Sequence, residues 1–543
     1  MITLRPTSLL ALTVAFSPLI AFAEDSAIAV EISDKVGATS VIDLLIETQW
    51  ANAGVQPSPR CDDRTFARRV YLDLVGRIPT KSELESFLAE TESNKRTTLV
   101  DRLLASPEYG RHFADVFDVV LMGRGSRKRM DQRQQHGWRE YLEESFNANR
   151  PWNLMARDMT LARKSDDVDV RAGWFLYERD NDHQAIAEAV SPVFFGIRIE
   201  CAQCHDHPLA DEIAQGHYWG LVSFFQRSKN DKTDAGPRVV ESASGAFNKF
   251  TNLEGDSFDT ELTFYASTVI PEPRPKEDEE KEQGDDSALY VASVANEPRV
   301  PKFSRREKFV DHVLLKHPML AKAYVNRIWA LLIGRGFVHP VDRMDSTSDI
   351  SHPKLLKWLA DNLTKSEFDT KDLVRSIVLS RPYQLASRTN EQTQPDTFSY
   401  GIEKSLTAET LLRSIYVAID PERSNPDPDL LAEFRDKFAD VFAEEPSSNP
   451  TQTLYLTNNP TFNQTLYDSQ LVKEIAQAGD TKEKVALAFE SILGRHPDQD
   501  ELQMATSFLT SQTDNSDGEV NVHAKVVSLV WAIVTSAEFR FNH

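Results

Sequence analysis

Cysteine is scarce in this chain: only three occur among its 543 residues. Three thiols cannot build the dense disulfide network that stabilises small secreted domains. Cys201 and Cys204 are close neighbours in the sequence, whereas Cys61 stands alone in a polar stretch. We therefore expect a fold built on a hydrophobic core, and the close pair needs a chemical explanation of its own.

Long hydrophobic runs are absent after the N-terminus. Residues 9–22 form an apolar run of about 14 residues, which follows Arg5 and ends in the small-residue pattern Ala21-Phe22-Ala23. A membrane-spanning helix needs about 20 apolar residues. The run therefore predicts a secretory signal peptide over residues 1–23, with an uncleaved membrane anchor as the alternative. We expect a secreted or periplasmic protein with no transmembrane span after cleavage.

Basic residues are outnumbered, with 61 Lys and Arg against 83 Asp and Glu and a net charge of −22. Such an acidic chain is repelled by nucleic-acid phosphates and by anionic lipid surfaces. The composition therefore argues against nucleic acid as a partner.

Familiar catalytic motifs are missing as well. The sequence contains no Gly-x-Ser-x-Gly, no His-Glu-x-x-His, no Walker loop and no Gly-x-Gly-x-x-Gly pattern. No catalytic residue can be assigned on this basis, and whether the protein is an enzyme stays open.

One motif with distinctive chemistry is present, Cys201-Ala202-Gln203-Cys204-His205. This spacing is that of c-type haem attachment, in which two thiols bond to the vinyl groups of haem and the histidine ligates the iron. We expect covalent haem c at Cys201 and Cys204, with His205 as the axial iron ligand. Candidates for a further ligand are His207, His217, His183, Met122 and Met155.

Two other interpretations of the motif remain open. A zinc site could use Cys201, Cys204 and His207 with His205 or His217, because thiolate and imidazole are the ligands that zinc prefers. The two cysteines could instead form a strained disulfide.

Apolar residues recur at helical spacing through most of the chain, which predicts a mainly α protein. We expect a helical domain over residues 24–227 that carries the motif, a connector over residues 228–303 and a second helical domain over residues 304–543. The connector alternates like a strand at residues 258–266, and its acidic, proline-rich residues 271–286 predict a disordered insertion. The basic residues 123–135 are predicted to form a loop.

Several further segments carry a family resemblance: Tyr71-Leu-Asp-Leu-Val-Gly-Arg-Ile-Pro-Thr80, Phe195-Gly-Ile-Arg-Ile-Glu200, Tyr324-Val-Asn-Arg-Ile-Trp329 and Leu379-Ser-Arg-Pro-Tyr-Gln384. Together with the cysteine motif they resemble a secreted, cytochrome-like family of planctomycetes and related bacteria, built from two paired domains of unknown function. The resemblance implies export and a c-type haem at the motif, but no established reaction.

Polar residues in the second part of this resemblance are candidates for a pocket, but structural hydrogen bonds and ion pairs are the favoured interpretation. They are Asn326, Arg327, Trp329, Asp342, Arg343 and Asp345.

The sequence therefore predicts an exported mono-haem c-type cytochrome-like protein in periplasmic redox or electron transfer, with an unidentified redox partner. The alternative is a non-haem binding or scaffold protein of the cell envelope, in which the motif holds zinc or a disulfide.

Overall fold

The structure is a computed structural model that describes residues 37–543, except residues 165–166, 234–235, 273, 275–285, 293–296, 388–393, 424, 439, 443–449 and 512–521. The predicted signal peptide and most of the predicted acidic insertion lie outside the described residues. Within them, helices dominate and strands form only short antiparallel pairs, so the predicted mainly α class is confirmed.

The N-terminal helices begin and end at residues that the sequence marks clearly. The Asp62 carboxylate accepts a hydrogen bond from the Thr65 amide at 2.7 Å and starts α2 (Asp63–Val75), and Gly76 ends the helix with φ +68°. The Thr80 hydroxyl and the Glu83 carboxylate cap each other's amides at the start of α3 (Lys81–Ala89), as the sequence predicts.

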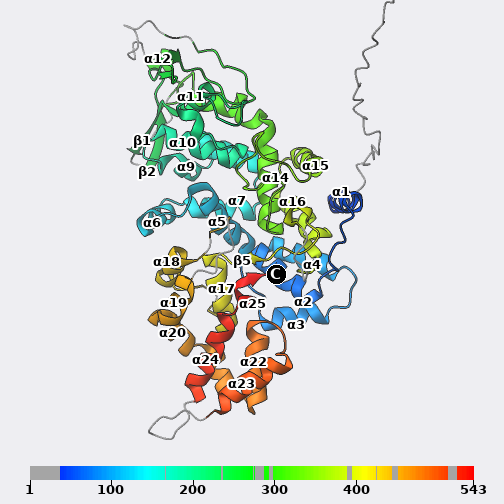
Figure 1. The fold of residues 1–543 in the computed structure, drawn as a ribbon. Helices are drawn as coiled ribbons and strands as arrows, with labels where there is room; N and C mark the ends of the chain where they lie inside the picture. Colours follow the sequence, from blue (N-terminus) through cyan, green and yellow to red (C-terminus); the bar gives the residue numbers. More distant parts are fainter. Residues whose placement is uncertain are drawn as a thin grey trace, which may run out of the picture. The chain divides into compact units, whose positions relative to one another are not determined.

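The other helices before the connector have the following bounds: α1 (Ala38–Ala53), α4 (Lys95–Ala105), α5 (Pro107–Met122), α6 (Arg127–Gln135), α7 (Trp138–Asn147), α8 (Trp152–Leu161), α9 (Trp174–Tyr177), α10 (His183–Val190) and α11 (Gln215–Phe225). Figure 1 shows their arrangement.

The prediction of a loop over residues 123–135 is wrong for most of that segment, because residues 127–135 form α6. The Ser126 hydroxyl caps this helix, a signal that the charge of the segment concealed. The Arg133 guanidinium is buried and pairs with Asp118 at 3.1 Å and Glu178 at 2.6 Å. Part of the basic charge of this segment is therefore neutralised by ion pairs inside the protein.

The connector contains two short hairpins and one short helix: β1 (Ser228–Thr233), β2 (Gly236–Glu241), β3 (Lys249–Thr251), β4 (Ser257–Asp259) and α12 (Asp286–Leu289). β1 pairs with β2, and β3 pairs with β4, both antiparallel. The strand predicted over residues 258–266 is wrong beyond Asp259, where the chain continues with a single bridge between Leu262 and Ile270.

The remaining elements are α13 (Arg305–His312), α14 (Pro318–Ile333), α15 (Pro353–Lys365), α16 (Thr370–Val378), β5 (Lys404–Ser405), α17 (Ala408–Ile419), α18 (Pro428–Lys437), α19 (Pro450–Asn458), α20 (Pro460–Tyr467), α21 (Gln470–Gln477), α22 (Thr481–Ile492), α23 (Gln499–Thr510), α24 (Val522–Val534), α25 (Ala537–Arg540) and β6 (Phe541–Asn542). None of the helices in the described ranges combines the length and the apolar character that crossing a bilayer requires.

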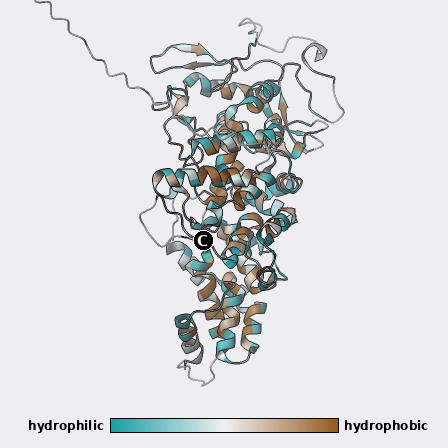
Figure 2. Ribbon diagram, turned by 90° about the vertical axis from the view of Figure 1, so that its right-hand side faces the viewer, coloured by the Kyte–Doolittle hydropathy of each residue, from teal (hydrophilic) through white to brown (hydrophobic). Residues whose placement is uncertain are grey.

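Buried apolar side chains of the described residues form two cores. Figure 2 shows hydrophobic residues, in brown, along many of the helices. The first core extends from Ile42 to Phe398 and includes side chains of α13 to α16. The second contains Leu72 and Ile78 together with side chains from Leu406 to Phe539. The domain boundary predicted at residue 304 stays a prediction, but these cores divide the helices near residue 400.

Buried ion pairs lie at two neighbouring places: Asp115, Glu409 and Arg413 lie where α5 and α7 meet α17 and α18, and Asp73 pairs with Lys404 where α2 meets β5. We call these five residues the seam. The Asp115 carboxylate contacts Arg139 at 2.5 Å and Arg413 at 2.8 Å, and the Glu409 carboxylate contacts Arg124 and Arg435. Burial alone would raise the pKa of Asp115, but the two guanidinium groups hold that pKa well below its usual value. The seam therefore depends on charges that stay ionised.

Candidate functional site

The segment before the cysteine motif is held against α14. After α10, a π-helical turn covers Ser191–Phe195. The Arg327 guanidinium, on α14, donates to the carbonyl oxygens of Val193 at 2.8 Å and Pro192 at 2.9 Å. The predicted structural role of Arg327 is therefore confirmed, and it fixes the approach to the motif.

The chain then turns at Gly196, which has φ +69°. A β-carbon at this position would lie 2.8 Å from the Met344 sulfur, so a larger residue would push the Met344 side chain aside and would be strained at this φ. The Met344 amide donates to the Gly196 carbonyl at 2.8 Å. The loop around residue 344 thus supports the chain just before the motif.

The motif itself begins in a short 3₁₀ turn, Glu200–Gln203. Ala202 is buried, whereas Cys201 and Cys204 are exposed free thiols. The Gln203 carbonyl accepts hydrogen bonds from the Trp219 indole and the Gln215 amide, both at 3.1 Å and both from α11. The backbone is anchored from one side, which leaves the two thiols accessible from the other.

His205 has its ring oriented by its own backbone. The Nδ1 atom lies 2.6 Å from the Asp206 carbonyl oxygen, which can only accept a hydrogen bond. Nδ1 must therefore carry the proton, and the lone pair of the neutral ring is on Nε2. This tautomer is the one in which Nε2 can bind a metal ion.

His207 and His217 have the opposite tautomer. Nδ1 of His207 accepts from the Ala210 amide at 2.9 Å and the Leu209 amide at 3.3 Å, and Nδ1 of His217 accepts from the Ala214 amide at 3.1 Å. In the neutral form, Nε2 of each ring must carry the proton. Burial lowers the pKa of His217, which favours that neutral form.

The other predicted ligands have different surroundings. Nε2 of His183 donates to the Ser228 carbonyl at 2.9 Å, the Met122 sulfur contacts Arg179 at 3.6 Å, and Met155 is fully buried in the first core. Cys61 is buried too, and its amide donates to the Gln384 carbonyl. None of these interactions involves the motif.

A preassembled metal site is absent from the described residues, where no three His, Cys, Asp or Glu side chains are grouped closely enough to hold an ion. The zinc interpretation therefore requires Cys201, Cys204 and the nearby histidines to move together. Haem attachment makes no such demand, because it uses two thiols and one imidazole of a single short segment.

The polar candidates from the second part of the family resemblance make structural contacts. The Asn326 amide group exchanges hydrogen bonds with the backbone of Val338, at 3.0 and 3.1 Å. Asp342 pairs with Arg198 at 2.8 Å, but this pair is partly exposed rather than buried as predicted. Trp329 stacks on Phe337 inside the first core.

A contact that the sequence did not predict joins the motif loop, residues 200–214, to the loop around residue 344. The Glu212 carboxylate accepts from the Ser346 amide at 2.7 Å and from the Ser346 hydroxyl at 2.6 Å. Burial acts to raise the pKa of Glu212, but these hydrogen bonds keep it below the usual value. No local sequence motif predicts this pair, because Glu212 and Ser346 are far apart in the sequence.

Two family models match the chain, one over a region that contains Glu212 and the other over regions of which the first contains Ser346. PSCyt2, a protein of unknown function (DUF1549), matches residues 41–230. PSD1, a protein of unknown function (DUF1553), matches residues 305–420 and 394–509. The chain belongs to the family that pairs these two domains. The family resemblance predicted from the sequence is therefore confirmed, and the hydrogen bonds between Glu212 and Ser346 join the two matched regions.

Beyond these family models, no similar protein was found. No curated protein and no solved structure matches the chain. Because both domains are described as being of unknown function, the function has to be argued from the residues of the motif.

Proposed function

We propose that the protein is an exported mono-haem c-type cytochrome-like protein that acts in periplasmic redox or electron transfer. The observation that carries the proposal is the tautomer of His205, whose Nε2 lone pair is available next to two exposed free thiols. Bound haem would supply a centre that gains and loses one electron. Cys201 and Cys204 would hold it covalently, and His205 would ligate the iron.

The hydrogen bonds of the loop favour His205 over its neighbours. A ring can bind iron through Nε2 only if that nitrogen has its lone pair free, and the amide contacts at Nδ1 place a proton on Nε2 of His207 and His217. The Asp206 carbonyl gives His205 the second hydrogen bond that commonly orients a metal-binding imidazole. The proposed site therefore has one histidine ligand from the motif loop.

Apolar side chains beside the motif suit a large planar cofactor. Leu209 is 75 % exposed, and the half-buried rings of Trp219 and Tyr265 lie on elements that contact the loop or His217. Covering these side chains would remove apolar surface from water. The chain would hold haem at its surface, where a partner can approach closely enough to exchange electrons.

The test is a pyridine haemochrome spectrum of protein exported together with a c-type cytochrome maturation system. We expect a c-type α band that survives denaturation, is lost in the Cys201→Ala/Cys204→Ala variant and is retained in Cys61→Ala, the matched control for losing a thiol. A colourless wild-type protein would refute the proposal and favour the zinc or disulfide alternative, which metal analysis and thiol titration then separate.

A second pair of variants tests the ligand. His205→Ala should lose the haem or change its axial ligation in the absorption spectrum, whereas His207→Ala, two residues away in the same loop, should keep the wild-type spectrum. Equal effects of the two substitutions would show that the tautomers do not select the ligand.

A further inference from the structure

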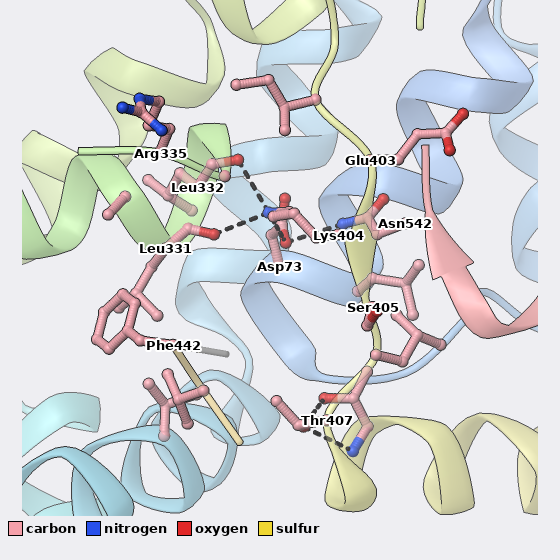
Figure 3. A pocket seen from close by; sticks show the side chains of 18 of the residues that line it. Asp73, Leu331, Leu332, Arg335, Glu403, Lys404, Ser405, Thr407, Phe442 and Asn542 are labelled. Atoms are coloured by element: carbon pink, nitrogen blue, oxygen red, sulfur yellow. Dashed lines mark hydrogen bonds and ion pairs between the residues drawn. The ribbon is translucent and has the colours of Figure 1, made fainter. Parts of the chain in front are cut away.

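A cavity of about 350 Å³ lies at the seam (Figure 3), within the range of volumes that small-molecule sites usually have. Its walls combine both cores: Phe113, Val116 and Leu332 belong to the first core, and Leu72 and Leu406 belong to the second. The two matched family regions therefore build it together.

One wall of the cavity is fixed by a set of polar contacts around Asp73, in which only Oδ1 of Asn542 is without a hydrogen-bond partner among the described residues. The Lys404 ammonium group donates to Asp73 at 2.7 Å and to the carbonyl oxygens of Leu331 at 2.8 Å and Leu332 at 2.9 Å. Asn542, which pairs with Lys404 across β5 and β6, donates to the same Asp73 oxygen, Oδ1, at 2.9 Å, as Figure 3 shows. The charges of Lys404 and Asp73 neutralise each other. This wall therefore does not require a charged ligand.

His112 differs from the polar groups around Asp73, because its ring nitrogens make no hydrogen bond to the described residues. The residue lies on α5, is only 7 % exposed and lines the cavity. Its ring meets Phe113 edge-on, and no hydrogen bond to the ring is found in the part of the chain that the structure describes. The ring lines the cavity, so a nitrogen without a protein partner is available to hydrogen-bond a ligand there.

Gly76 makes the position of His112 possible. A β-carbon on Gly76 would lie 2.3 Å from Nδ1 of the imidazole, a distance that no side chain could tolerate. The glycine that ends α2 therefore also leaves room for the ring beside the cavity.

The charges around the cavity nearly cancel. Lys404 and Arg335 contribute two positive charges, and Asp73, Glu403 and Asp440 contribute three negative charges. Burial, with a further contribution from the nearby Arg413, lowers the pKa of His112 to about 4, so the ring is neutral at pH 7. A neutral imidazole offers one hydrogen-bond donor and one acceptor. An anionic ligand would thus find no net counter-charge here.

We propose that this cavity binds an uncharged small molecule with an apolar body and a hydroxyl or amide group that hydrogen-bonds to the His112 ring. The apolar side chains of both cores receive the body, and His112 orients the polar end. The site is separate from the cysteine motif, and the inference does not rest on the proposed haem.

The test uses three fluorinated probes of similar size, followed by ¹⁹F NMR with the full-length protein. 4-Fluorophenol carries the hydroxyl group, 4-fluorotoluene replaces it by a methyl group, and 4-fluorobenzoate carries a negative charge. We expect 4-fluorophenol to bind and 4-fluorobenzoate to bind at least tenfold more weakly. The binding should be lost in Val116→Phe, which fills the cavity from α5.

The role of His112 is measured by the ratio of the dissociation constants of 4-fluorophenol and 4-fluorotoluene. Loss of one hydrogen bond should change this ratio by about three- to tenfold in favour of 4-fluorotoluene in His112→Phe. His352→Phe is the matched control, since His352 is equally buried but does not line the cavity, and it should leave the ratio unchanged.

A measurement on the wild-type protein covers the case in which His112→Phe does not fold. With ¹⁵N-labelled histidine, the signal of His112 should shift when 4-fluorophenol is added. Because His339 also lines the cavity, its signal is told apart from that of His112 by comparison with a His339→Gln variant, in which the His339 signal is absent. The proposal is overturned if the His112 signal does not shift, if 4-fluorobenzoate binds as well as 4-fluorophenol, if none of the probes binds, or if Val116→Phe leaves binding intact.

Discussion

The motif loop and the seam hold their polar side chains in opposite surroundings. In the motif loop, Cys201 and Cys204 face solvent and the backbone is held by a few hydrogen bonds to α11. In the seam, Asp115 and Glu409 are almost fully buried, and each contacts two guanidinium groups. The exposed thiols are thus separated from the buried ion pairs that join the two cores.

The difference also decides how each region should respond to mutation. Removing one partner of a buried ion pair leaves the other charge without compensation, whereas exposed pairs are solvated and contribute little. The predictions below compare the two regions, beginning with the largest effect.

Asp115→Asn should have the largest effect, because Arg139 and Arg413 would lose their shared carboxylate. We expect the free energy of unfolding to fall by about 3–5 kcal/mol, the range found when one member of a buried pair is removed. Denaturant unfolding followed by circular dichroism measures it. A loss below about 1 kcal/mol would show that the seam does not hold the cores together.

Acid should weaken the core regions through two histidines. Burial is the main cause that lowers the pKa of both His112 and His352 to about 4, so the unfolded chain binds more protons between that pKa and about 6.5. Stability should therefore fall as the pH is lowered through this window, by roughly 2 kcal/mol for each histidine at pH 5.

Two variants separate these contributions. His112→Gln and His352→Gln should each reduce the difference in unfolding free energy between pH 7.5 and pH 5 by roughly 2 kcal/mol, and the double variant should reduce it by the sum of the two. If the pH dependence of both single variants equals that of the wild type, other groups cause the acid sensitivity.

Glu212→Gln should act locally. The substitution weakens the acceptor for the Ser346 amide and hydroxyl groups, at a cost of about 1 kcal/mol. We expect faster hydrogen–deuterium exchange, by about fivefold, in peptides that cover the motif loop and the loop around residue 344. Peptides of α5 and α17 serve as the internal control, and faster exchange there as well would contradict a local role.

Arg198→Ala should have the smallest effect. Its ion pair with Asp342 is partly exposed, and such pairs contribute about 0–1 kcal/mol. Measuring the free energy of unfolding of this variant and of Asp115→Asn under the same conditions compares a partly exposed ion pair with a buried one. A loss as large as that of Asp115→Asn would mean that the contact next to the motif supports the whole fold.

Much of the local structure follows from short sequence signals. The helix starts at Asp62, Thr80 and Ser106 and the end at Gly76 depend on contacts within a few residues, so they can be predicted from the sequence. The helix over residues 127–135 was missed because its basic residues suggested a solvated loop, while Arg133 is neutralised by Asp118 and Glu178 from other helices.

By itself, the sequence determined the mainly α class, the paired-domain family and the position of the cysteine motif, because each depends on residues close together in the chain. Only the tertiary structure decided which histidine of the motif loop has a free Nε2 lone pair, since that depends on the backbone groups facing each ring. It alone also brought Asp73, His112, Lys404 and Asn542 to one cavity. Their contacts span hundreds of residues, and packing of the two cores, rather than any local pattern, brings them together.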